Sequence, residues 1–250
     1  MRGREAEERN PGALPPDFVE LPDSSTCTTL RERLSAYLHS LDQENAPVLE
    51  RLRERAVNSN VPVIRREMES FLRVLLRMKN PGRILEIGTG TGYSTLFLAS
   101  ETAEEAGITS IENYPARILA ARENLMESPY AGKIRLLEGD AALILPDLPG
   151  HFDFIFLDAA KGQYIRYLPE LMRLLEEGGI LVSDNVLQDG TILESRFALK
   201  RRERTIHRRM REYLFALTHT EGLVTSIVPI GDGAAVTVKV GSGAGGARTE

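Results

Sequence analysis

The stretch Ile84-Leu-Glu-Ile-Gly-Thr-Gly-Thr-Gly-Tyr93 decides the predicted fold class, because a short apolar run leads directly into a glycine-rich turn. The apolar run predicts a buried strand over Arg83–Ile87. The three glycines at alternate positions permit a sharp turn and let the backbone approach a ligand closely. A helix is predicted next, over Thr91–Ser100. This order predicts a ligand site at the carboxyl end of a parallel strand.

The alternation of strands and helices continues beyond this turn. The further predicted strands are Ile108–Glu112, Ile134–Leu137, Phe152–Leu157 and Ile180–Ser183, and the further predicted helices are Pro115–Glu127 and Ile165–Leu175. Short strands separated by helices indicate parallel crossovers. Near the end of the chain, Leu223–Ile230 and Ala234–Val240 flank Gly231-Asp-Gly233, which is typical of an antiparallel hairpin. We therefore expect an α/β fold with a mostly parallel seven-stranded sheet and a C-terminal antiparallel hairpin.

The chain is predicted to form one domain between two flexible ends. Residues 1–28 are rich in Pro, Gly, Glu and Arg and are interpreted as a mobile tail. Residues 29–240 are predicted to form the domain, which begins with helices punctuated at Pro47 and Pro62. Residues 241–250, rich in glycine, are interpreted as a flexible C-terminus.

Composition favours a soluble protein of the cytoplasm. The 250 residues include one cysteine, Cys27, which cannot form an internal disulfide. The first residues lack the apolar stretch of a secretory signal, and no apolar run approaches the roughly 20 residues that cross a membrane. The net charge of −5 argues against indiscriminate binding of nucleic acid, although it leaves room for a local basic face.

Acidic residues around the glycine turn indicate which ligand it binds. Glu86 precedes the turn, and Glu112 lies twenty residues beyond Gly92, where a carboxylate can accept ribose hydroxyls. A pyrophosphate fits poorly beside these acids, whereas a cationic sulfonium fits well. Gly139-Asp140-Ala141 follows the third strand and is similar to the adenine contact of methyltransferases. The alternative interpretation is a structural turn with solvated acids.

A second group of polar residues follows two neighbouring strands. Asp158 ends one strand and Asp184-Asn185 ends the next, so all three should lie at the same edge of the sheet. Their oxygens form a set that suits Mg²⁺, Ca²⁺ or Mn²⁺ better than Zn²⁺. Lys161 lies three residues past Asp158, within reach of the same cavity. Alternatively, the aspartates are turn or capping residues and Lys161 is a surface charge.

Residues from about 60 to 240 resemble the metal-dependent catechol and caffeoyl-CoA O-methyltransferase family, whose fold is Rossmann-like. The resemblance implies S-adenosylmethionine and a divalent metal, Mg²⁺, as cofactors, and Lys161 as the catalytic base. The metal ligands it implies are Asp158, Asp184 and Asn185. The cofactor-binding residues it implies are Val63, Glu86, Gly88, Gly90, Tyr93, Ser94, Glu112, Gly139, Asp140, Ala141 and Asp158.

Within that family the chain looks most similar to the bacterial tRNA 5-hydroxyuridine methyltransferases. The matching stretches are Asn60-Val-Pro-Val-Ile64, Asp184-Asn-Val-Leu-Gln-Asp-Gly190, Arg204-Thr-Ile-His-Arg-Arg-Met-Arg-Glu-Tyr213 and Leu223–Asp232 with Pro229-Ile-Gly-Asp-Gly233. This resemblance implies tRNA as the substrate and 5-methoxyuridine at the wobble position as the product. It also implies that the protein can be a homodimer, for which the N-terminal helices are candidates.

A strongly basic segment supports contact with RNA. Residues Arg196–Glu212 hold eight cationic side chains against two acidic ones. On a helix, Ile206, Met210, Leu214 and Leu217 would share one face, and Arg201, Arg204, Arg208 and Arg211 the opposite face. Such a stripe can follow RNA phosphates, but a solvated helix face is the usual role of a charge run. Two other functions remain open, a small-molecule enzyme acting on catechol-like phenols and a non-catalytic RNA-binding protein.

Overall fold

The computed structural model describes residues 30–42, 44–59, 61–195 and 197–241. The predicted tail 1–28, nearly all of the predicted C-terminus and the four residues Thr29, Gln43, Asn60 and Arg196 therefore lie outside the described residues. The chain divides into two compact units, Met1–Gln43 and Glu44–Glu250. In the first unit, helix α1 spans Leu30–Ser40. All other elements belong to the second unit.

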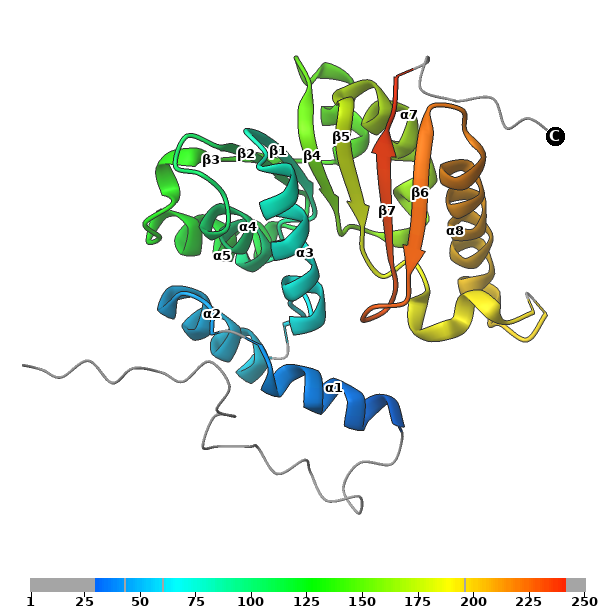
Figure 1. Cartoon of the computed structure of the whole chain (residues 1–250), viewed down its shortest axis with the longest axis horizontal. Coiled ribbons are helices and arrows are strands. Elements are labelled where there is room, and N and C mark those ends of the chain that lie inside the picture. The colour runs from blue at the N-terminus through cyan, green and yellow to red at the C-terminus, as the bar shows by residue number, and fades with distance from the viewer. Residues whose placement is uncertain (1–29, 43, 60, 196, 242–250) are drawn as a thin grey trace, which may run out of the picture. The chain divides into compact units, whose positions relative to one another are not determined.

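The second unit is built around a seven-stranded sheet with the strand order β3-β2-β1-β4-β5-β7-β6 (Figure 1). The strands are β1 (Arg83–Ile87), β2 (Gly107–Glu112), β3 (Ile134–Glu138), β4 (Phe152–Leu157), β5 (Leu175–Ser183), β6 (Leu223–Val228) and β7 (Ala234–Lys239). The first five run parallel, and β7 pairs antiparallel with both β5 and β6. The predicted mostly parallel sheet with a C-terminal antiparallel hairpin is confirmed.

Helices connect the strands at close to the predicted places. The helices are α2 (Pro47–Asn58), α3 (Arg66–Lys79), α4 (Tyr93–Ser100), α5 (Pro115–Met126), α6 (Ala141–Ile144), α7 (Tyr164–Leu174) and α8 (Arg201–His219), with short 3-10 turns η1 (Ala131–Lys133), η2 (Leu145–Asp147), η3 (Lys161–Gln163) and η4 (Gln188–Leu193). Helix α4 begins two residues later than predicted, because Gly92 has a φ of 92° and cannot belong to a right-handed helix. Among the described residues, none of the helices combines the length and apolar character needed to cross a bilayer.

Alternate strand positions supply two apolar cores, one on each face of the sheet. Leu85 and Ile155 pack with residues of α7 and α8. Ile84 and Phe154 pack with residues of α2, α3 and α4 on the other face. Strands covered on both faces need apolar residues at almost every position, which explains the continuous apolar runs in the sequence.

The register aligns the ends of four neighbouring strands. Ile87 pairs with Ile111 of β2 and with Leu157 of β4. Leu157 in turn pairs with Ser183 of β5. The next residues of three strands, Gly88, Asp158 and Asp184, therefore begin loops at one edge of the sheet, and Glu112, which ends β2, lies at the same edge.

Gly88 is the tightest point of this edge. Its φ of +103° is unfavourable for other residues, and a Cβ atom there would lie 1.9 Å from the carbonyl oxygen of Asp158. The neighbouring Gly90 also has a positive φ, +57°, but a Cβ atom there would meet nothing within 4 Å. Gly88 is therefore required by backbone contact, whereas Gly90 leaves open space beside the turn.

A buried carboxylate lies beneath the same turn. Glu86, in the middle of β1, is 0% exposed. Its Oε2 accepts hydrogen bonds from the hydroxyls of Thr95 and Ser110, and its Oε1 has no hydrogen-bond partner in the described part of the chain. Burial raises the pKa of Glu86 to about 7, against the opposing effect of its hydroxyl partners.

We expect Gly88→Ala to destabilise the fold far more than Gly90→Ala. The clash at residue 88 should lower the free energy of unfolding by roughly 3 kcal/mol. Gly90→Ala should cost only the strain of its backbone conformation, about 1 kcal/mol. Urea unfolding of both variants and the wild type checks this, and equal losses would contradict the close approach at Gly88.

We expect Glu86 to make the stability depend on pH. The folded chain holds the proton up to a pKa of about 7, whereas the ordinary value is 4.5, so the folded state binds more protons between these values. The free energy of unfolding should therefore fall as pH rises through this window and level off above it. Glu86→Gln has no such titration, so its stability relative to the wild type should rise by roughly 3 kcal/mol across the window. A constant difference in urea unfolding at each pH would refute this.

Candidate functional site

A cavity of about 650 Å³ opens at the carboxyl edge of the sheet. Its walls come from the α2–α3 connection, from the loops that follow β1 to β5, and from the β6–β7 turn. Most of the predicted site residues line it, namely Val63, Gly88, Gly90, Tyr93, Ser94, Glu112, Gly139, Ala141, Asp158, Lys161, Asp184 and Asn185. The structure therefore brings the predicted cofactor and metal residues into one cavity.

Two predicted cofactor residues do not line the cavity. Glu86 is wholly buried beneath the glycine turn. Asp140 is exposed and caps α6, where its Oδ1 accepts a hydrogen bond from the backbone N–H of Ala142 at 2.9 Å. Its neighbours Gly139 and Ala141 do reach the cavity wall.

Glu112 is held in place by the backbone around it. Its Oε2 accepts from the N–H of Gly90 at 2.8 Å, and its Oε1 accepts from the N–H groups of Asn113 and Tyr114, each at 3.0 Å. These bonds tie the end of β2 to the glycine turn after β1. A carboxylate has about four acceptor positions, so this one can still accept a hydroxyl from a ligand.

Lys161 lies between an acid and a buried phenol. Its Nζ donates to Oδ1 of Asp158 at 2.8 Å and lies 2.9 Å from the hydroxyl of Tyr164. Tyr164 is 0% exposed, and its hydroxyl lies 3.1 Å from the carbonyl oxygens of Leu157 and Asp184. Tyr164 thus fixes the amine of Lys161 at the ends of β4 and β5.

Asp158 and Asp184 crowd negative charge at this edge. They follow the paired residues Leu157 and Ser183. Burial first, and then the charge of Asp158, raises the pKa of Asp184 to about 7, against the opposing charge of Lys161. The adjoining Asn185 has a φ of 54°, which turns the chain sharply after Asp184. A bound cation would stabilise the ionised form of both acids.

The acidic residues alone do not make a metal site. Within the described ranges, no three His, Cys, Asp or Glu side chains form a group that could hold a metal ion. The predicted set of Asp158, Asp184 and Asn185 contains only two acids, so it needs the amide oxygen of Asn185 as its third ligand. The structure brings these three residues to one cavity, and the metal remains a prediction.

The basic helix α8 exposes the four predicted arginines, Arg201, Arg204, Arg208 and Arg211. The opposite face agrees with the prediction at Met210 and Leu217, which are buried, but not at Ile206, which is 39% exposed. His207 and Tyr213 are buried in addition. Ile206 instead lies over Gly162, where a Cβ atom would be 3.6 Å from its side chain. The helix is rotated in this way because its buried side must cover Tyr164, against which Tyr213 packs edge-on at 5.4 Å.

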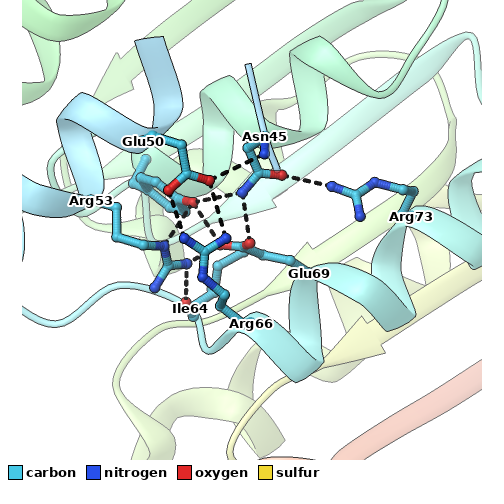
Figure 2. Close-up of polar contacts among 8 residues, drawn as sticks. Asn45, Glu50, Arg53, Ile64, Arg66, Glu69 and Arg73 are labelled. Atoms are coloured by element: carbon cyan, nitrogen blue, oxygen red, sulfur yellow. Dashed lines mark hydrogen bonds and ion pairs between the residues drawn. The ribbon is translucent and has the colours of Figure 1, made fainter. Parts of the chain in front are cut away.

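Two features near the cavity were not predicted from the sequence. One is an ion pair of 2.8 Å between Arg65 and Asp232, which joins the α2–α3 connection to the β6–β7 turn. The other is a polar network around Arg53 and Glu69, behind the cavity wall (Figure 2). A sequence signal exists for Glu69, because it shares the apolar stripe of α3 with Leu72 and Leu76, and a lone acid in such a stripe indicates a buried partner.

Comparison with known proteins gives the family. A family model described as O-methyltransferase matches residues 38–240. A catechol O-methyltransferase from Niastella koreensis is 34% identical over 128 residues, which is 50% of this chain and 58% of that protein. Caffeoyl-CoA O-methyltransferase 1 from Eucalyptus globulus is 32% identical over 173 residues, 65% of this chain and 69% of that protein. The chain thus spans little more than half the length of the Niastella protein.

Solved structures share the fold over most of the chain. A chain from Staphylococcus aureus superposes with a TM-score of 0.77 and 32% identity, covering 82% of this chain and 99% of that one. A methyltransferase from Podospora anserina with bound S-adenosylhomocysteine (SAH) superposes with a TM-score of 0.75 and 27% identity. The match covers 84% of this chain and 94% of that one. The fold is therefore the Rossmann-like one of S-adenosylmethionine-dependent O-methyltransferases. Because the family match takes in every described strand and the whole wall of the cavity, the chain belongs to the O-methyltransferase family.

Proposed function

We propose that the protein is an S-adenosylmethionine-dependent O-methyltransferase. The observation that carries the proposal is the single cavity that holds the glycine turn, Glu112, Asp158 and Lys161. The cavity fits the cofactor, because the open space beside Gly90 leaves room at the turn and acids suit a cationic ligand. Bound there, the cofactor supplies an electrophilic methyl group on its sulfonium.

Each end of the cofactor has candidate partners in the cavity wall. Glu112 accepts a ribose hydroxyl, and the backbone around Val63 and Gly88 faces the methionine end. Gly139 and Ala141 lie where the adenine contact is expected, while Asp140 shapes this wall as the cap of α6. Glu86 acts from beneath the turn, because its buried carboxyl holds Thr95 and Ser110 together under the loop.

We further propose that Asp158, Asp184 and Asn185 hold a divalent metal ion, Mg²⁺. The support is the donor set of three hard oxygens and the raised pKa of Asp184, which comes first from burial and then from the charge of Asp158. When bound, the metal would lower the pKa of a substrate hydroxyl beside it. In its neutral form the amine of Lys161 accepts the hydroxyl proton, and Tyr164 keeps that amine aimed at the site.

The substrate that we propose is 5-hydroxyuridine at the wobble position of tRNA, which the enzyme would convert to 5-methoxyuridine. The 5-hydroxyl of this base neighbours the C4 carbonyl, just as the two oxygens of a catechol neighbour each other. The exposed arginines of α8 support an RNA substrate. Arg209 donates to the carbonyl of Gly162 at 3.1 Å, so this basic helix adjoins the residue that follows Lys161.

A catechol-like phenol is the second candidate substrate. The names of the Niastella and Eucalyptus relatives favour it, since both are enzymes of small molecules by name. The same two-oxygen chemistry would apply, and the basic helix would then be a solvated surface. The third candidate is a non-catalytic RNA-binding protein. In such a protein, the ion pair between Lys161 and Asp158 would have no role.

A transfer assay decides among these functions. Purified protein, labelled S-adenosylmethionine and Mg²⁺ are incubated with tRNA that carries 5-hydroxyuridine, beside a catechol control. Metal-dependent label on the 5-oxygen of the nucleoside supports the tRNA substrate. Label in the catechol alone favours a small-molecule substrate. If neither compound is labelled but the protein still binds tRNA, the result favours a non-catalytic RNA-binding protein.

We expect Lys161→Ala to lower kcat by about 10²–10⁴-fold, the usual contribution of a general base. Calorimetry should find the Kd for S-adenosylhomocysteine nearly unchanged, because the amine faces the substrate. Asp158→Ala should abolish dependence on added Mg²⁺. Equal losses of rate and cofactor affinity in Lys161→Ala would exclude it as the base, and full wild-type activity in chelator would exclude the metal.

We expect the double variant Arg204→Glu, Arg208→Glu to bind tRNA more weakly than the wild type. The slope of log Kd against log salt should decrease by about 1.5, because two phosphate contacts are lost. Arg51→Glu, Arg55→Glu is the matched control, since both arginines are exposed and are also spaced four residues apart on a helix, α2. Equal effects of the two pairs would show a net-charge effect and not a binding face.

A further inference from the structure

Two of the walls of the cavity come from distant parts of the chain. One wall is the α2–α3 connection, residues 61–65, and the other is the glycine turn that leads into Tyr93 at the start of α4. Neither wall is a regular element. Their separation decides whether a ligand fits between them, and the contacts that join them from behind help to set this separation.

Arg53 of α2 joins both walls directly. Its Nη2 donates to the carbonyl oxygen of Ile64 at 2.8 Å, and its Nε donates to the hydroxyl of Tyr93 at 3.1 Å. The guanidinium also lies over the Tyr93 ring, 4.7 Å from its centroid. Figure 2 shows Arg53 directed at Ile64 and at Glu69 of α3. The guanidinium of Arg53 therefore contacts three segments, which are the α2–α3 connection, the start of α4, and α3.

Glu69 completes this unit and is almost wholly buried, with a side chain 3% exposed. It forms an ion pair with Arg53 and accepts the hydroxyl of Tyr93 at 2.6 Å. Burial, and then the charge of Glu69, raises the pKa of Tyr93, so the phenol keeps the proton that it donates. Breaking such a buried ion pair is costly, because the loss of one partner leaves a buried charge that neither the protein nor water compensates.

Further polar contacts surround the Arg53–Glu69–Tyr93 unit (Figure 2). Asn45 donates to Oε2 of Glu69 at 2.9 Å and accepts from Arg73 at 2.6 Å. Glu50 and Arg66 form two parallel hydrogen bonds, 2.6 and 3.1 Å long, between α2 and the start of α3. These contacts hold α2 and α3 in a fixed relation on either side of the connection.

We propose that the Arg53–Glu69–Tyr93 unit positions the two walls of the cofactor cavity, so that cofactor affinity depends on a charge that lies behind the wall. This inference rests on the proposed cofactor, S-adenosylmethionine. Arg53 is a positioning residue, since it does not line the cavity and acts through Ile64 and Tyr93. By linkage, cofactor binding must in turn stabilise the connection between α2 and α3.

The test is the affinity of purified full-length variants for S-adenosylhomocysteine, measured by calorimetry. Arg53→Met keeps the length of the side chain but loses its donors, and should raise the Kd about tenfold or more. Arg53→Lys should recover part of the affinity. The matched control is Arg122→Met, which removes another arginine with two bonds to a carboxylate, Glu138, each 2.6 Å long, and should leave the Kd unchanged.

Hydrogen exchange with and without the ligand separates positioning from simple stability. In the wild type, the ligand should slow exchange of the amides of Val63 and Ile64. In Arg53→Met, this protection should be lost while protection of the glycine turn remains. If the variant unfolds at a lower temperature but has the wild-type Kd and the same protection, the unit is only structural and the proposal is wrong.

Tyr93→Phe provides a second variant should Arg53→Met not fold. It removes one hydroxyl and keeps the ring in the wall, so it should raise the Kd and reduce protection of Val63 and Ile64. Wild-type behaviour of Tyr93→Phe would overturn the proposal. Failure of the wild type itself to bind the ligand is a different result, because it would reject the proposed cofactor and the inference together.

Discussion

The contact between the backbones of Gly88 and Asp158 is the constraint on which the rest of the site depends. Any side chain at residue 88 would lie within bonding distance of the Asp158 carbonyl. The parallel register of β1, β4 and β5 puts Asp158 and Asp184 side by side at the same edge. The glycine thus allows the turn after β1 to lie against the acids after β4, and both line one cavity.

Much of this arrangement could be predicted from the sequence, because it follows from local patterns. The glycine turn and the apolar runs gave the strands with their bounds correct to within a few residues, except that β5 begins at Leu175 and not at Ile180. Residues at strand ends, such as Asp158 and Asp184, could be placed together because parallel strands end at a common edge. In this fold, the strand order alone is enough to predict that such residues lie together in one site.

Contacts between distant helices could not be predicted in the same way. The stripe of α3 indicates that Glu69 is buried, but Arg53 looks like an ordinary surface charge, and only the packed structure shows its guanidinium between Ile64 and Tyr93. The rotation of α8 was missed for a similar reason. Its apolar spacing suits either Ile206 or His207 on the buried face, and packing of Tyr213 against Tyr164 decides between them.

The place of β7 between β5 and β6 has a consequence for the order of assembly during synthesis. The loop after Asp184 is held by the later hairpin, because Val186 donates to the carbonyl of Gly233 and Leu187 to that of Asp232, at 2.9 and 2.8 Å. Strands β1 to β5 can pair as the chain leaves the ribosome, but the backbone N–H groups of Val186 and Leu187 gain these acceptors only when the hairpin has emerged. A nascent chain can thus hold a finished glycine turn beside an unfinished loop after β5.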